Sequence, residues 1–217
     1  MAKPIWGVDS AAPVDERLLN CVVSNYGKPE FWGRYIRTVP GAADGLTRRE
    51  ASFLRENGIK IMPIYSAFRR AVGYDQGRIA ARNAHYHAKL LGIPRGVVVF
   101  ANVERFFEVD DAWIRGWADV FYASEYKAGF YHDPREGGFA AAYCRAASAS
   151  ENVREHAILW SAEPDPGATK KAEAPAFEPA TPPCRAHVWV WQYGRDADAC
   201  PIDTNLASPL LVKHLWA

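Results

Sequence analysis

The sequence predicts an α/β protein folded as a single irregular (β/α)8 TIM-like barrel. Short apolar runs alternate along the chain with amphipathic segments whose apolar residues recur at helical spacing. About eight runs have the length of strands, and strands separated by helices pair in parallel. No glycine-rich phosphate-binding loop follows any of them, which disfavours the alternative architecture, an open doubly wound sheet.

The predicted strands share a short apolar core and end at polar or turn-forming residues. The run VVVFANVE, for example, has five apolar residues before its first polar one, which is typical of a strand buried on both faces. The predicted strands are residues 4–10, 31–36, 59–66, 96–104, 127–133, 156–163, 187–194 and 200–207.

Helix signals occupy the segments between the first five strands. Thr47 and Glu50 have the spacing of a capping box, and Asp75 is expected to cap a helix that ends before Gly92. Trp113 and Trp117 share one helical face and are interpreted as packing residues. The predicted helices are 15–27, 47–58, 75–91 and 110–122, followed by the Ala-rich segment 137–148 and a C-terminal helix or docking tail at 209–216.

The end of the chain departs from regular βα alternation. Residues 164–183 are rich in Pro and Ala and have no hydrophobic period, so they are predicted to form a long surface loop. The last strands lack full helices between them, which predicts a barrel that is irregular at its end. The loop is too short for a domain, and one domain covering residues 1–217 is expected.

Composition and charge narrow the classes of partner. Of the 217 residues, 49% are hydrophobic and 24% charged, as in soluble globular proteins. The net charge is +1 without a run of Lys or Arg, so nucleic acid and anionic membrane surfaces are not indicated. No apolar run reaches the roughly 18–20 residues of a transmembrane helix. The N-terminus shows no secretory signal, which leaves open a cytoplasmic protein, signal-independent export, or a removed leader.

The four cysteines and the histidines give no metal-binding pattern. No CxxC pair is present, which argues against a zinc site. Cys21 and Cys144 lie in helix-like segments and are expected to be buried thiols. Cys184 and Cys200 flank one strand and are the candidates for a disulfide in an oxidising compartment. His85 and His87 lie two positions apart on a predicted helix, where side chains do not share a face, so no metal or cofactor is expected.

Acids, amides and aromatic residues gather where the predicted strands end, the position of reactive groups in such barrels. Asn102 and Glu104 are two positions apart and therefore point to one side of their strand. For two of these acids a structural role remains open as the alternative to a role in the site. Glu104 can form an ion pair with Arg105 or Arg37, and Asp9 can cap the following turn. The other candidates at strand ends are Tyr35, Tyr65, Tyr131, Trp160, Gln192 and Asp203.

Three motifs, in order along the chain, carry a family resemblance. GVDS, FANVE and VWQYG…CPIDTN are similar to the glycoside hydrolase family 25 (lysozyme-type) barrels. They resemble more closely the bacterial glycoside-hydrolase-like domain-of-unknown-function family. The resemblance implies a carboxylate-lined cleft for a glycan, with Glu104 as the proton donor and Asp9 and Asp203 as supporting acids. Trp191, Gln192 and Tyr193 match the family's WQY segment.

One residue departs from the family pattern. Asn102 stands where the family usually has Asp. Glycosidic cleavage needs one carboxyl group to protonate the leaving oxygen and a second to stabilise or attack the anomeric carbon. Asn102 cannot supply charge, although it can hydrogen-bond an N-acetyl group that acts as an internal nucleophile.

Three hypotheses for function follow. The first is a glycoside hydrolase acting on a cell-envelope or other complex polysaccharide, with peptidoglycan as one candidate substrate. The second is a catalytically impaired glycan-binding barrel, because of Asn102. The third is another reaction on a small molecule, since the fold hosts many chemistries. The sugar, the linkage, the stereochemical outcome and the oligomeric state stay open at this level.

Overall fold

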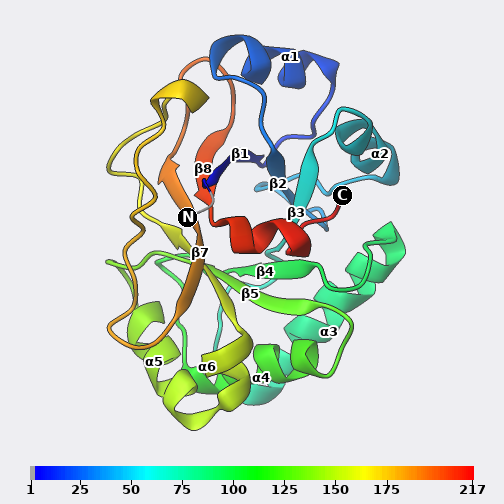
Figure 1. Ribbon diagram of the computed structural model, residues 1–217. Coiled ribbons are helices and arrows are strands. Elements are labelled where there is room, and N and C mark those ends of the chain that lie inside the picture. Colours follow the sequence, from blue (N-terminus) through cyan, green and yellow to red (C-terminus); the bar gives the residue numbers. More distant parts are fainter. Residues whose placement is uncertain (1–2) are drawn as a thin grey trace.

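The computed structural model describes residues 3–217, in which eight strands form a closed barrel (Figure 1). Met1 and Ala2, the first residues of the predicted domain, lie outside the described residues. The strands pair in chain order, as the βα alternation predicts. They are β1 (Ile5–Ser10), β2 (Phe31–Tyr35), β3 (Lys60–Tyr65), β4 (Val98–Asn102), β5 (Lys127–His132), β6 (Ile158–Ala162), β7 (His187–Gly194) and β8 (Asp203–Ala207).

The last strand runs against its neighbours. Strands β1 to β7 pair in parallel, whereas β8 is antiparallel to both β7 and β1. The connection from β7 to β8 contains no helix, and such a short connection joins antiparallel strands. The predicted irregularity at the end of the barrel is therefore confirmed. As a result, the first residue of β8 lies at the same barrel rim as the last residues of β1 to β7.

Helices surround the barrel wall (Figure 1). Thr47 accepts a hydrogen bond from the amide of Glu50, which confirms the cap of the second helix. The expected cap at Asp75 is wrong, because the third helix begins one residue earlier and has Gly73 at its N-cap. The helices are α1 (Glu16–Asn25), α2 (Arg48–Glu56), α3 (Tyr74–Leu91), α4 (Asp111–Tyr122), α5 (Phe139–Ala149), α6 (Glu151–His156), η1 (Lys171–Glu173) and η2 (Pro209–His214). Over residues 3–217, no helix combines the length and the apolar character needed to cross a membrane.

Two apolar layers lie on the two sides of the barrel wall. Trp113 and Trp117 stack in the layer between strands and helices, as their helical spacing predicts. Leu211 and Leu215, in and after η2, pack into the barrel interior. Because η2 follows β8, it closes the barrel at the end opposite Asp203. The polar strand ends therefore meet at the other rim.

The cysteines form two disulfides, Cys21–Cys200 and Cys144–Cys184. The expectation of free thiols at Cys21 and Cys144 and of a Cys184–Cys200 disulfide is wrong. Cys184 and Cys200 lie beyond opposite ends of β7, whose 8 residues span about 26 Å at roughly 3.3 Å per residue. A disulfide requires Cα atoms closer than about 7 Å. The observed disulfides instead tie α1 to the β7–β8 loop and α5 to the segment before β7.

Removing the Cys21–Cys200 disulfide is expected to destabilise the protein by about 2–4 kcal/mol, because the unfolded chain regains the freedom of a long closed loop. The test is urea unfolding of a Cys21→Ala, Cys200→Ala double variant against the oxidised protein. The reduced protein, which also loses the Cys144–Cys184 disulfide, should be less stable than the double variant. A double variant as stable as the oxidised protein would contradict the prediction.

Candidate functional site

A cavity of about 240 Å³ lies at the rim formed by the strand ends. Three carboxylic acids contribute to its wall: Asp9 near the end of β1, Glu104 just after β4, and Asp203 at the start of β8. They are far apart in the sequence and meet because β8 is reversed. The cavity is lined by Asp9, Tyr35, Ile64, Asn102, Glu104, Tyr131, Trp160, Gln192, Arg195 and Asp203.

Gln192 joins two of the acids. Its Nε2 donates to Oδ2 of Asp9 at 3.1 Å and to Oδ2 of Asp203 at 2.9 Å. Its Oε1 accepts from the Tyr131 hydroxyl at 2.9 Å and from Nε of Arg195 at 3.0 Å. Two donors on the oxygen fix the orientation of the amide, so that its NH₂ group faces the carboxylates. The acids are thereby held on either side of one amide.

Asp9 is buried and accepts from a second amide. Nδ2 of Asn205 donates to Oδ2 of Asp9 at 2.7 Å, and Oδ1 of Asn205 accepts from the indole of Trp160. The capping role considered for Asp9 is not observed, because Asp15 caps the following helix. Asp9 is therefore part of the cavity floor.

Burial makes both Asp9 and Asp203 retain protons, and the charge of Asp203 strengthens this effect at Asp9. Burial, and then the neighbouring charge of Asp203, raises the pKa of Asp9 well above its usual value. Burial is also the main cause that raises the pKa of Asp203 to about 6. The amide donors act in the opposite direction but do not reverse the shift. At mildly acidic pH the two carboxyl groups thus hold protons that exposed aspartates would have lost.

Replacing Asp203 by Asn should change how stability depends on pH. A carboxyl group whose folded-state pKa is raised contributes stability below its unfolded pKa, near 4, and loses it as pH rises through about 6. The Asn variant has no such loss. Its free energy of unfolding, relative to the native protein, is expected to gain about 1–2 kcal/mol between pH 4 and pH 7.

Only the difference between the two proteins isolates this effect. Burial lowers the pKa of His132 to about 4. The contribution of His132 to the free energy of unfolding is therefore lost as pH falls over nearly the same range. Urea unfolding of both proteins at several pH values measures the difference. A difference that does not vary with pH would contradict the assignment.

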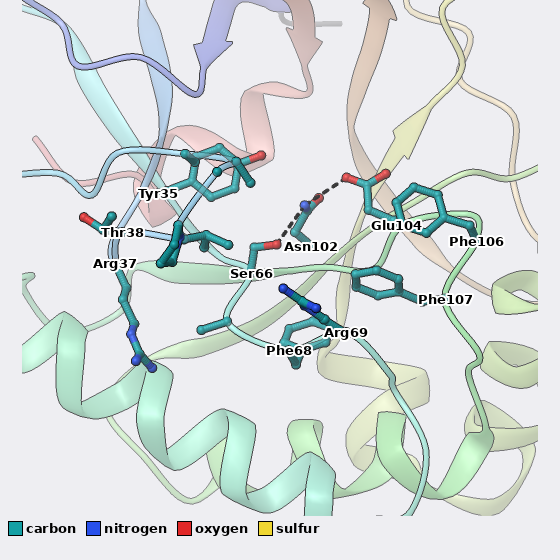
Figure 2. Close-up of a pocket in the computed structure, with 16 residues that line it drawn as sticks. Tyr35, Arg37, Thr38, Ser66, Phe68, Arg69, Asn102, Glu104, Phe106 and Phe107 are labelled. Carbon is teal, nitrogen blue, oxygen red and sulfur yellow. Dashed lines mark hydrogen bonds between the residues drawn. The ribbon is translucent and has the colours of Figure 1, made fainter.

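Glu104 and Asn102 point toward each other at the cavity mouth. Nδ2 of Asn102 donates to Oε1 of Glu104 at 3.0 Å and to the hydroxyl of Ser66 at 3.1 Å (Figure 2). Their shared side of the strand agrees with the period of two. The alternative ion pair is not observed, because Arg105 pairs with Glu136 and Arg37 approaches no carboxylate of the described chain.

A larger groove of about 880 Å³ adjoins the cavity. Its walls are the β2–α2 loop, the start of the β3–α3 loop and the β4–α4 loop. Tyr35, Asn102 and Glu104 line both spaces. An extended ligand in the groove that places one end in the cavity therefore passes Glu104.

Some predicted residues lie behind the barrel wall. Tyr65, Trp191 and Tyr193 face the helix-side layer. Tyr65 packs against Trp117, and the indole of Trp191 donates to the carbonyl of Glu163. Side chains alternate along a strand, so the neighbours of an inward-facing residue such as Gln192 face outward. Location at a strand end alone therefore did not show which residues point into the cavity. Of the predicted binding residues, the structure brings Tyr35, Tyr131, Trp160 and Gln192 to the cavity.

Arg195, which lines the cavity, and Asn205, which donates to Asp9, were not among the predicted site residues. Asn205 lies two positions after Asp203, and the period of two could have identified it. Arg195 lies in a loop, and no sequence pattern indicated its direction. No group of three or more His, Cys, Asp and Glu side chains in residues 3–217 is placed to hold a metal ion.

Comparisons with known proteins agree with this geometry. Residues 28–205 match the family model described as Rv2525c-like, glycoside hydrolase-like domain. The crystal structure of an uncharacterized B. stearothermophilus protein is 54% identical, with a TM-score of 0.96 over 98% of this chain and 100% of the other. No curated protein matches the sequence.

More distant structures share the fold. The Mycobacterium tuberculosis Tat-secreted protein Rv2525c, in complex with HEPES, has a TM-score of 0.64 at 16% identity, over 98% of this chain and 99% of the other. The Clostridium perfringens spore cortex lytic enzyme SleM has a TM-score of 0.62 at 16% identity, over 100% of this chain and 71% of the other. The family resemblance inferred from the sequence motifs is confirmed.

Proposed function

The chain belongs to the Rv2525c-like, glycoside hydrolase-like domain family, and from this premise we propose that it is a glycoside hydrolase acting on a cell-envelope or other complex polysaccharide. The observation that carries the proposal is the meeting of three carboxylic acids, Asp9, Glu104 and Asp203, in one cavity that opens into a groove. Paired carboxyl groups are what glycosidic cleavage requires.

In this proposal one sugar ring occupies the cavity and the rest of the glycan lies in the groove. The cavity, at about 240 Å³, is smaller than the roughly 300–1,000 Å³ pockets that bury drug-sized ligands, which suits a single ring. The bond between this ring and the next then lies at the boundary of the two spaces. Glu104 lines both, so it is the acid placed to protonate the leaving oxygen.

Asp9 and Asp203 lie deeper and face the ring rather than the leaving group. With the pKa of Asp203 near 6 and that of Asp9 also raised, the pair retains a proton in mildly acidic solution and carries less than two negative charges. The remaining charge stabilises the positive charge that develops at the anomeric carbon. Gln192 holds both carboxyl groups in place for this role.

Asn102 favours an N-acetylated sugar. Its NH₂ group is committed to Glu104 and Ser66, while its Oδ1 accepts no hydrogen bond from residues 3–217. That oxygen is free to accept the N–H of an acetamido substituent, which would orient the acetyl oxygen as an internal nucleophile. Such assistance replaces the carboxylate that the family usually has at this position.

The two disulfides support a target outside the cytosol, because disulfides persist mainly in oxidising compartments. One fold neighbour is named a spore cortex lytic enzyme. A bacterial envelope glycan is therefore the first substrate to test.

A glycan-binding barrel without turnover is the second candidate. Asn102 supports it, since the amide removes one charge from the site that hydrolysis uses. Both candidates predict glycan binding, and they differ only in bond cleavage.

The test is a panel of peptidoglycan and other bacterial polysaccharides, with binding and the release of reducing ends measured on the same samples. Release of reducing ends supports the hydrolase. Binding without release over a long incubation supports the binding barrel. If the protein neither binds any of these glycans nor releases reducing ends from them, both candidate functions are contradicted.

A further inference from the structure

The groove beside Glu104 carries a net positive charge. Its lining includes two arginines, Arg37 and Arg69, and a single acid, Glu104. Neither arginine forms an ion pair with any carboxylate of residues 3–217, whereas the neighbouring Arg70 pairs with Glu108 at 2.6 Å. The loops of the groove thus neutralise one adjacent arginine and leave Arg69 unpaired.

The two groove arginines point in different directions. Figure 2 shows Arg37 extending away from Asn102 and Glu104, toward a helix below the groove, while the guanidinium of Arg69 is drawn between Ser66 and Phe107, in the groove that Asn102 and Glu104 also line. Arg69 is therefore the cation available to a ligand next to the proposed cleavage position. Arg195, in the cavity, differs because the charges of Glu104 and Asp203 offset its own.

Two aromatic residues, Phe106 and Phe107, line the same groove as Arg69. Phe106 is 76% exposed, which is unusual for a large apolar side chain, and it packs edge-on against Phe107. Figure 2 shows Phe106 next to Glu104. A sugar ring that stacks on Phe106 lies in the groove that Arg69 also lines.

We infer that the groove selects a glycan bearing a carboxylate on the ring that follows the cleaved bond, and that Arg69 determines this specificity. The inference rests on the proposed placement of a glycan in the groove. Guanidinium pairs with carboxylate through charge-assisted, often bidentate, hydrogen bonds. The carboxylate can belong to a hexuronic acid or to a lactyl ether on an N-acetylated hexosamine, because both present the same group.

The experiment measures binding of two acidic tetrasaccharides to the full chain carrying Glu104→Gln, so that the ligand stays intact. One alternates N-acetylglucosamine with glucuronic acid, and the other alternates N-acetylglucosamine with peptide-free N-acetylmuramic acid. Each is compared with its carboxyl-reduced form by isothermal titration calorimetry. Adding Arg69→Gln should weaken binding of the preferred acidic form about three- to tenfold and leave the reduced form unchanged.

Two further variants separate charge from stacking. Arg70→Gln, at a paired arginine outside the groove lining, should change no affinity. Phe106→Ala should weaken the acidic and reduced forms by the same factor. The acidic form that binds more tightly identifies the source of the carboxylate.

Three results would each overturn the inference. They are equal binding of the acidic and reduced forms, a weakening of both forms by the same factor in Arg69→Gln, and no binding of any of the four oligosaccharides. Reducing-end release by the native protein is scored separately. Release without carboxylate preference refutes this inference alone. Carboxylate-selective binding without release refutes only the hydrolase.

Discussion

Replacement of Glu104 by Gln is expected to lower kcat/KM on a cleaved glycan by about a hundred- to ten-thousandfold, the usual contribution of a general acid. Gln keeps the size of the side chain and still accepts the Asn102 amide, but it has no proton to deliver to the leaving oxygen. The loss should fall mainly on kcat, because the groove and cavity that bind the glycan remain. Reducing-end kinetics on the best polysaccharide of the panel measure it.

The leaving group gives a readout that a structural defect would not produce. On an aryl glycoside with an acidic phenol, cleavage needs little protonation, so Glu104→Gln should lose much less activity than on the natural glycan. Glu108→Gln is the matched control, since Glu108 is an exposed acid in the same loop that pairs with Arg70. Equal losses on both substrates would assign Glu104 to binding or folding instead of proton transfer.

The barrel and the approximate position of its site could be predicted because both follow from local patterns. Alternation of buried strands with amphipathic helices determines a parallel barrel, and parallel strands end at one rim. Asp9 and Glu104 could therefore be placed at that rim from sequence. Asp203 was also predicted as a strand-end residue, but it is the first residue of β8 and reaches the rim only because β8 is reversed.

What the sequence could not show are the contacts between distant segments. The partners of Cys21 and Cys144 depend on how loops fold over the barrel, which chain spacing does not report. The direction of Arg195 depends on a loop in the same way. Tyr65 and Trp191 were misplaced for a different reason, because a strand buried on both faces shows no alternation of polarity that would tell inward from outward.

A buried ion pair holds the loops around the site, and it too escaped prediction. Glu50 looked like the second member of a capping box, but its Oε1 pairs with Nε of Arg34 at 2.6 Å and accepts the amide of Val14 at 2.8 Å. Arg34 has no exposed surface. Its other nitrogens donate to the carbonyls of Ser10 and Asp44. The pair thus joins the chain leaving β1, next to Asp9, to the β2–α2 loop that forms one wall of the groove.

Glu50→Gln is therefore expected to destabilise the protein by about 3–5 kcal/mol, since it leaves the Arg34 charge buried without a counter-charge. Urea unfolding measures the loss, and Glu56→Gln, at an exposed position of the same helix, is the control and should cost little.

Replacing both members of the pair, as Arg34→Met with Glu50→Leu, should recover part of the stability because no lone charge remains. The double variant is nevertheless expected to bind glycan more weakly than the native protein, since the two loops lose the carbonyl contacts of Arg34. A loss below about 1 kcal/mol in Glu50→Gln would mean that Arg34 is stabilised by its carbonyl partners alone.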